Sequence, residues 1–410
     1  MKKAALLIVC TLCVFMFSNC AKKSTISTTS DLETSIKSAS KNSLFAGFAV
    51  TVVKKDKILY QQAFGQADVA KNTPYTNQTL QPIASVSKTF IGVALMKAVE
   101  KGYFTLETPI NNILPFAVKN PNSPNSPITI RHLATHTSGL LDVEKTYYKS
   151  HSILSGENTT TAEAKRMINE FGIAENSTVL PLKDFLKAYY TEGSSLYDTG
   201  NFYKGEAGAA YNYSNIGASL AAYLIEVKSG KTFAAYCDDN IFRPLSMNTT
   251  SWFLKEENRS KMAKLHWMRE KPLPFYTNSS YPDGSLITSN EDLSKYFIEM
   301  IKGYSGESTF LTKASFDELF KKQFEVGKMP LNMNPKEENA GIFWVYFKNG
   351  RLGHTGGDFG VTTFMVFNPD RKTGFIFLAN SEVENLEDAI PIQKQLQSVF
   401  SSIKEFEANN

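Results

Sequence analysis

The chain has 410 residues, of which 42% are hydrophobic and 20% charged, a globular composition that excludes disorder, collagen and coiled coil as overall descriptions. At roughly 150 residues per domain, this length suggests about two to three domains. The net charge of +4 comes from 44 basic and 40 acidic residues, and so small an excess gives no reason to expect nucleic acid as a partner.

The chain begins with Lys2 and Lys3, followed by an uncharged, mostly apolar run over residues 4–18. This run is shorter than the about 17–25 residues of a membrane-spanning helix, so it predicts a signal peptide over residues 1–19. Cys20 follows shortly after this run, in a sequence that resembles a bacterial lipoprotein cleavage site. We therefore predict an exported, periplasm-facing lipoprotein with a lipid on Cys20. Ordinary secretion with cleavage nearby is the alternative.

Three of the four cysteines lie in the first 20 residues. Cleavage before Cys20 removes two of them and leaves Cys237 without a disulfide partner, so Cys237 is expected to be a small buried hydrophobic residue. Residues 24–40 contain ten Ser or Thr, which predicts that residues 20–42 form the lipid anchor and a tether. Ser30 and Glu33 fit a capping box, and therefore a short helix at the end of this tether.

Two apolar, β-branched runs at 46–54 and 57–64 predict a β-hairpin. A long apolar stretch from Ser85 to Lys101 predicts a helix, which Gly102 ends. Helical segments are expected over 103–280, the clearest of them at 216–228. Within that region, residues 141–210 are rich in Asn, Thr, Ser and Gly and predict an irregular surface excursion.

Towards the C-terminus, Ser289 and Asp292 fit a capping box at the start of another helix. Strands are then predicted at 342–347, 361–367 and 375–378, followed by a final helix at about 384–404. Strands at both ends of the chain with helices between them predict an α+β fold. Its mostly antiparallel sheet domain would be split between 43–105 and 281–405, and the helical domain of residues 106–280 would be inserted between the two parts.

The spacing of two histidines is the first candidate metal signature in the sequence. His132 and His136 are four apart, so they can share a helical face, but no HExxH motif accompanies them and a structural role near a helix end is favoured over zinc. The G-x-S-x-G motif, the P-loop and the Gly-rich dinucleotide motif are absent, which disfavours an α/β-hydrolase triad.

A Ser-x-x-Lys pattern occurs at Ser85 and Lys88, at the start of the apolar helix. The same spacing occurs at 38–41 and 401–404, but those matches lie in polar terminal segments. In the first turn of a helix, this spacing brings the lysine ammonium beside the serine hydroxyl. The free N–H groups of the turn would stabilise a developing anion. Burial favours loss of the lysine proton, which would make Lys88 a base for a Ser85 nucleophile.

A Tyr-x-Asn pattern at Tyr213 and Asn215 runs directly into a predicted helix. A phenol with a pKa of about 10 is a poor base unless cations hold it as phenolate, which Lys88 could do. The Asn215 amide can donate to a substrate carbonyl. A third pattern, His354-Thr355-Gly356-Gly357, is expected just before a strand. Its glycines would let a backbone N–H approach a ligand, although the motif read alone favours a glycine turn in a hairpin.

Taken in order, these patterns resemble the serine β-lactamase and penicillin-binding-protein superfamily, in its class C β-lactamase-like branch. The segments 83–90, 130–140, 241–247 and 284–289 are similar to that family, and the similarity extends over roughly residues 45–400. It implies a mostly antiparallel sheet flanked by helices beside an all-helical domain. It assigns the two histidines of segment 130–140 to structure, and it implies no metal and no organic cofactor.

The resemblance also implies a role for each residue of the motifs. Ser85 would be the acylated nucleophile and Lys88 would assist its deprotonation, while Tyr213 would exchange the proton, first as base and then as acid. The remaining implied roles are substrate binding by Asn215, His354, Thr355 and Gly356, and an oxyanion hole made by the backbone amides of Ser85 and Gly357.

One departure from the family pattern concerns the substrate. The third motif usually begins with Lys, which helps to bind a substrate carboxylate, whereas here it begins with His354. The unperturbed pKa of histidine is about 6.5, so this side chain is largely neutral at pH 7. We therefore expect a serine hydrolase of an ester or a peptide-like, D-amino-acid or peptidoglycan-like amide. A binding or sensor lipoprotein without turnover and a true β-lactamase are the alternatives.

Overall fold

The computed structural model describes residues 25–175, 179–382 and 386–410. The predicted signal peptide and Cys20 lie outside these residues. Within the described part of the chain, no helix combines the length and the apolar character needed to cross a membrane.

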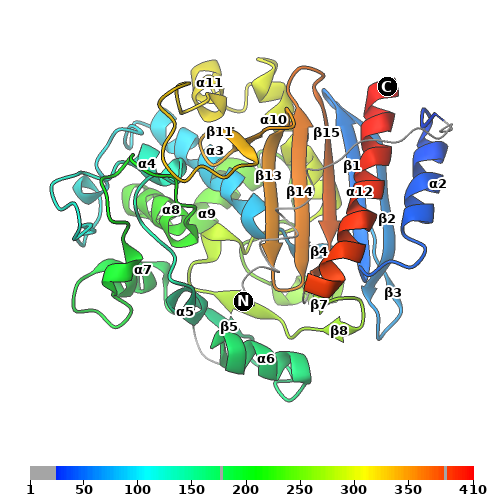
Figure 1. The fold of residues 1–410 in the computed structure, drawn as a ribbon, viewed down its shortest axis with the longest axis horizontal. Helices are drawn as coiled ribbons and strands as arrows, with labels where there is room; N and C mark the ends of the chain where they lie inside the picture. The colour runs from blue at the N-terminus through cyan, green and yellow to red at the C-terminus, as the bar shows by residue number, and fades with distance from the viewer. Residues whose placement is uncertain (1–24, 176–178, 383–385) are drawn as a thin grey trace.

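The fold is built on one eight-stranded antiparallel sheet with the order β11-β12-β13-β14-β15-β1-β2-β3. Its strands are β1 (Gly47–Lys54), β2 (Lys57–Asp68), β3 (Thr73–Pro74), β11 (Glu337–Ala340), β12 (Val345–Phe347), β13 (Leu352–Asp358), β14 (Val361–Asn368) and β15 (Thr373–Ala379). β1 pairs with β15, and Val50 lies opposite Phe377, so the N-terminal hairpin joins the C-terminal strands in one sheet (Figure 1). The predicted hairpin, the α+β class and the return to strands after residue 340 are confirmed.

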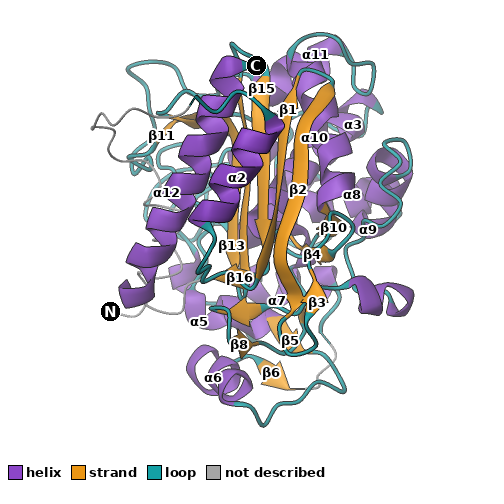
Figure 2. Cartoon of the chain, turned by 90° about the vertical axis from the view of Figure 1, so that its right-hand side faces the viewer, coloured by secondary structure: helices purple, strands orange, loops and turns teal. Residues whose placement is uncertain are grey.

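Helices cover both faces of this sheet (Figure 2). The helices are α2 (Thr29–Ala39), α3 (Ser87–Glu100), α4 (Ile130–Ala134), α5 (Glu144–Tyr147), α6 (Ala162–Phe171), α7 (Leu182–Tyr190), α8 (Asn215–Ser229), α9 (Phe233–Cys237), α10 (Asn290–Tyr304), α11 (Lys313–Phe320) and α12 (Leu386–Asn409). α2 and α12 lie on one face, and α3, α8 and α10 lie on the other. All residues of β15 are buried, as this double covering requires.

The segment predicted as a tether is largely part of the folded domain. Leu32 and Ile36 of α2 are fully buried, in one cluster with Phe377 of β15 and Leu396 of α12. The helix is capped by Thr28 and Asp31, and not by the predicted pair Ser30 and Glu33. The Thr28 hydroxyl accepts a hydrogen bond from the backbone N–H of Asp31. The tether prediction is therefore wrong for α2, because two apolar side chains one helical turn apart suffice to dock a Ser/Thr-rich helix.

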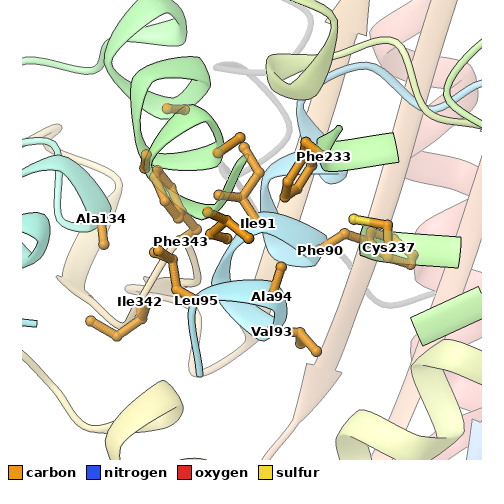
Figure 3. Packing of buried hydrophobic residues seen from close by; sticks show 14 of the residues in the cluster. Phe90, Ile91, Val93, Ala94, Leu95, Ala134, Phe233, Cys237, Ile342 and Phe343 are labelled. Atoms are coloured by element: carbon orange, nitrogen blue, oxygen red, sulfur yellow. The ribbon is translucent and has the colours of Figure 1, made fainter. Parts of the chain in front are cut away.

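α3 is the central helix of the other layer. Eleven of its 14 residues are buried, and Figure 3 shows Phe90 and Ile91 packed among side chains from several elements, Cys237 among them. Cys237 is fully buried, as predicted. A helix that is apolar around most of its circumference must be enclosed on all sides, so α3 holds its first turn in a fixed position.

The segment 141–210 is more regular than predicted, because it contains α5, α6, α7 and two short strands. The small sheets of the molecule pair β5 (His151–Ile153), β6 (Ala174–Glu175) and β9 (Tyr276–Asn278); β7 (His266–Trp267), β8 (Lys271–Pro272) and β16 (Ser381–Glu382); and β4 (Leu80–Pro82) and β10 (Ile287–Ser289). The β4–β10 pair brings residues 281–289 beside the start of α3. The domain boundaries proposed from the sequence remain a prediction.

Candidate active site

Ser85 lies in a 3₁₀ turn, η1 (Ala84–Val86), directly before α3, so the regular helix begins two residues later than predicted. The preceding residue, Ala84, has a φ of 47°, a left-handed conformation that costs a non-glycine residue about 1–2 kcal/mol. The Ala84 side chain is buried, and the β4–β10 pair holds the chain before it. The structure therefore stores backbone strain next to Ser85.

Lys88 is completely buried and makes three polar contacts. Its Nζ lies 3.1 Å from Ser85 Oγ, 2.7 Å from Asn215 Oδ1 and 2.6 Å from the Asp283 carbonyl oxygen. Burial lowers the pKa of Lys88 to about 8, against the opposing charge of Asp283. Because Asn215 Oδ1 and the carbonyl can only accept, a neutral Lys88 donates to both and directs its lone pair at the Ser85 hydroxyl.

Tyr213 is a further neighbour of Lys88 and Ser85. Its ring centroid is 5.1 Å from Lys88 Nζ, and its hydroxyl lies near the Ser85 side chain. Although 38% of the Tyr213 surface is exposed, desolvation of the phenol raises its pKa well above 10, against the lowering effect of the Ser85 side chain. The phenolate that the sequence suggested is therefore not favoured, and Tyr213 is a proton donor in the resting site.

The two predicted structural histidines hold this arrangement. His132 Nδ1 accepts the Thr129 amide at 3.2 Å and caps α4. His136 Nδ1 accepts the Ser214 amide at 3.2 Å, and its ring centroid lies 4.3 Å from that of Tyr213. Their structural role is confirmed. In the described residues, no three His, Cys, Asp or Glu side chains are grouped as metal ligands would be.

Two carboxylates that sequence reasoning missed complete the surroundings of Lys88. Asp142 accepts hydrogen bonds from the backbone N–H of Asn215 at 2.6 Å and from the Ser214 hydroxyl at 2.8 Å. These two bonds fix the start of α8. Asp283 lies in a 3₁₀ turn, η7 (Tyr281–Asp283), and its carboxyl accepts the hydroxyls of Tyr147 and Ser219 at 3.2 Å each. Burial raises the pKa of the Asp283 carboxyl and Lys88 opposes that rise.

The His354–Gly357 motif lies inside β13 and is followed by β14, the strand predicted after it, whereas the alternative that the motif itself forms a hairpin turn is wrong. His354 pairs with Met365 of β14 and Gly357 pairs with Thr362. A Cβ on Gly356 would lie only 2.5 Å from the Ile83 carbonyl oxygen and 3.0 Å from the Ser85 nitrogen. Glycine is required here because β13 lies directly against the backbone of η1, which brings Gly357 into the neighbourhood of the Ser85 amide.

His354 is 4% exposed, and burial together with Lys88 lowers its pKa to about 4. Its Nδ1 lies 2.6 Å from the Thr355 carbonyl oxygen. A carbonyl only accepts, so Nδ1 carries the proton and Nε2 presents a lone pair. Nε2 has no hydrogen-bond partner among the described residues. Strand alternation places the Thr355 side chain on the opposite face of β13.

The structure thus brings Ser85, Lys88, Tyr213 and Asn215 into one cluster against β13. A sheet flanked by helices with such a cluster at the start of a buried helix is the arrangement of the serine β-lactamase and penicillin-binding-protein superfamily. The Beta-lactamase family model matches residues 32–398, and the chain belongs to this family, whose members are generally serine hydrolases.

Two relatives and two solved structures illustrate how far the similarity goes. Penicillin-binding protein 4* of Bacillus subtilis (strain 168) is 25% identical over 346 residues, which are 79% of this chain and 66% of that protein. Protein flp of Staphylococcus aureus (strain MRSA252) is 23% identical over 376 residues, or 88% of this chain and 66% of that protein. The chain therefore spans just under two thirds of the length of these relatives.

Among solved structures, the octameric penicillin-binding protein homologue from Pyrococcus abyssi has a TM-score of 0.64 at 22% identity and covers 86% of this chain and 73% of its own. The penicillin binding protein from Bacillus halodurans has a TM-score of 0.63 at 21% identity and covers 90% of this chain and 98% of its own. At such identities the likeness shows the fold.

Proposed function

We propose that this protein hydrolyses an ester or a peptide-like amide through an acyl-enzyme on Ser85. The observation that carries the proposal is the contact set of Lys88 Nζ, which lies within 3.1 Å of Ser85 Oγ and is otherwise held by two acceptors. A buried amine with a pKa of about 8 is a competent base near neutral pH.

In the proposed reaction, Lys88 takes the Ser85 proton while Oγ attacks the substrate carbonyl carbon. The amides of Ser85 and Gly357 stabilise the oxyanion, a contribution of about 3–4 kcal/mol for each donor in the transition state. When the intermediate collapses, the bond to the leaving group breaks and Tyr213 donates its phenolic proton to that group. The Lys88 ammonium then reprotonates Tyr213. Water then attacks the acyl-enzyme by the reverse route and restores Ser85.

The choice of substrate follows from His354. A neutral imidazole with an unpartnered lone pair does not attract a carboxylate, so this site disfavours a β-lactam as its substrate. Neutral esters and peptide-like or D-amino-acid amides, including those of peptidoglycan-like fragments, fit the site better. A true β-lactamase is correspondingly less favoured, although three of the similar proteins carry penicillin-binding in their names.

The test is steady-state hydrolysis of p-nitrophenyl esters, D-amino-acid amides, D-Ala-D-Ala peptides and a chromogenic cephalosporin, with Ser85→Ala as the control. The proposal predicts multiple turnovers of an ester or amide that Ser85→Ala abolishes, and slow or no cephalosporin hydrolysis. A single burst without turnover would instead support the sensor lipoprotein, and efficient cephalosporin hydrolysis would support the β-lactamase.

We also propose export and anchoring through a lipid on Cys20, supported by the pattern of residues 1–20. Fractionation of cells that express the chain tests this. The Cys20→Ala variant should leave the membrane fraction, and an unchanged distribution would contradict the anchor.

A further inference from the structure

One face of β13 passes directly beside Ser85. Because side chains alternate along a strand, His354, Gly356 and Asp358 share this face. Gly356 lies against the Ser85 nitrogen. The two polar residues therefore lie on either side of Ser85, each about 7 Å along the strand from Gly356 at the usual rise of about 3.3 Å per residue.

The His354 side of this face belongs to the leaving group. His354 and Tyr213 have ring centroids 6.3 Å apart, and Tyr213 is the proton donor to the leaving group in the proposed reaction. His354 offers only the Nε2 lone pair there, which is buried and without a partner in the described part of the chain. The acyl part of a substrate bound to Ser85 must therefore extend along β13 in the other direction, towards Asp358.

Asp358 is half-buried close to the nucleophile. Gly284 lies between Asp358 and the backbone just before Ser85. A Cβ placed on Gly284 would be 3.8 Å from Asp358 Oδ2 and 3.7 Å from the Ala84 carbonyl carbon. Oδ1 accepts the Phe359 amide at 2.8 Å, and the Tyr276 hydroxyl donates to the Phe359 carbonyl oxygen at 3.3 Å. Among the ion pairs of residues 25–175, 179–382 and 386–410, none involves Asp358.

A cluster of aromatic rings lies near this carboxylate. Phe359 contacts Tyr148 and Tyr276 with ring centroids 5.5 and 5.8 Å apart. The charge of Asp358 is one cause that raises the pKa values of Tyr148 and Tyr276, so both phenols lie within its field. Carboxylates combined with aromatic faces are the usual protein partners of an ammonium group.

We infer that Asp358 binds a protonated amine on the acyl part of the substrate, an inference that rests on the proposed function. Both polar residues of the β13 face are acceptors, so the face selects a donor and repels a carboxylate. The substrate class is then an ester or amide of an amino-acid-like acid whose amine is free.

The experiment compares p-nitrophenyl esters that differ in one terminal group: β-alanyl with an ammonium, butanoyl with a methyl and succinyl with a carboxylate. Esters with one and two additional methylenes are included, so that the terminal group is tested at several distances from the ester carbonyl. Uncatalysed hydrolysis is subtracted from every rate. The variants are Asp358→Asn, which removes the charge, and Asp358→Glu, which keeps it. Asp56→Asn, in the exposed turn between β1 and β2, is the matched control.

The wild type, Asp56→Asn and Asp358→Glu should prefer the ammonium ester over the methyl ester by about tenfold in kcat/KM, with the carboxylate ester slowest. Asp358→Asn should reduce that preference to about twofold or less. Equal rates for the three esters in the wild type, or an unchanged preference in Asp358→Asn, would overturn the inference and leave the hydrolase intact. Absence of turnover together with an unlabelled Ser85 would overturn both proposals.

Discussion

Lys88 is the residue whose chemistry depends most on its surroundings. A lysine at the surface is protonated at pH 7 and cannot take a proton from serine. Here, burial disfavours the ammonium, while Asp283, Asp142 and Asp358 favour it. The balance leaves the pKa of Lys88 at about 8, so a useful fraction is neutral near physiological pH.

This balance predicts the pH dependence of the reaction. The reacting form is the neutral amine, which is present above its pKa and lost below it. For a neutral ester, kcat/KM should therefore rise about tenfold per pH unit below pH 8 and level off above it. A profile that stays flat between pH 6 and 9, after subtraction of uncatalysed hydrolysis, would contradict the assignment of Lys88 as the base.

Asp283→Asn tests the electrostatic part of the account. The Asp283 carboxylate stabilises the Lys88 ammonium, so its removal should move the midpoint of the kcat/KM profile to lower pH, while the backbone carbonyl that accepts from Lys88 remains. Asp56→Asn should leave the midpoint in place. A midpoint that stays at its wild-type pH or moves upwards in Asp283→Asn would show that this charge does not reach Lys88.

At the residue scale, sequence patterns could predict the residues that belong to short motifs. Ser85, Lys88, Tyr213 and Asn215 were all predicted and do meet in space. Asp283 could not be found in this way, because it is 195 residues from Lys88 and contacts it through a backbone carbonyl. Asp142 was missed for a similar reason, since it caps a helix that begins 73 residues later.

At the scale of elements, the contact between β13 and η1 positions the backbone of Gly356 and Gly357 next to Ser85. Glycine disfavours strands, so the paired glycines suggested a turn from the sequence alone. In the structure they permit a backbone approach that any Cβ would block. The glycines are needed because β13 packs against η1, which is some 270 residues away in the chain. A local sequence pattern does not contain this contact, so it could not predict the strand.

Gly356→Ala tests this contact. The new methyl group must push β13 away from Ile83 and Ser85, so the oxyanion hole should be lost and kcat/KM should fall by about a hundredfold or more. Circular dichroism and thermal unfolding show whether the sheet is retained. A variant that folds and keeps more than about a third of the activity would contradict the proposed role of this contact.

α2 makes a second prediction at this scale. Leu32 is fully buried between the sheet and α12, so Leu32→Ala should lower the free energy of unfolding by about 2–5 kcal/mol. Thr34→Ala, on the exposed side of the same helix, should change it by less than about 0.5 kcal/mol. Denaturant unfolding measures both, and equal stabilities of the two variants would restore the tether interpretation.

At the scale of the whole molecule, the chain closes its sheet late. β1 pairs with β2 in a local hairpin, but the other edge of β1 is paired only by β15, more than 300 residues further on. Strand patterns at both ends of the sequence were enough to predict this closure. The two- and three-residue strands of the small sheets were not predictable, because so short a segment has no periodicity and forms only where its partner already lies.

The closed sheet, the buried α3 and the docked β13 together fix the position of Ser85. The central claim is that this arrangement makes Ser85 a nucleophile, and the most direct test is the intact mass of the folded protein after treatment with a fluorophosphonate. The account predicts one adduct per chain, mapped to Ser85 and absent in Ser85→Ala. Folded wild-type protein that remains unmodified, or that is modified equally in Ser85→Ala, would contradict it.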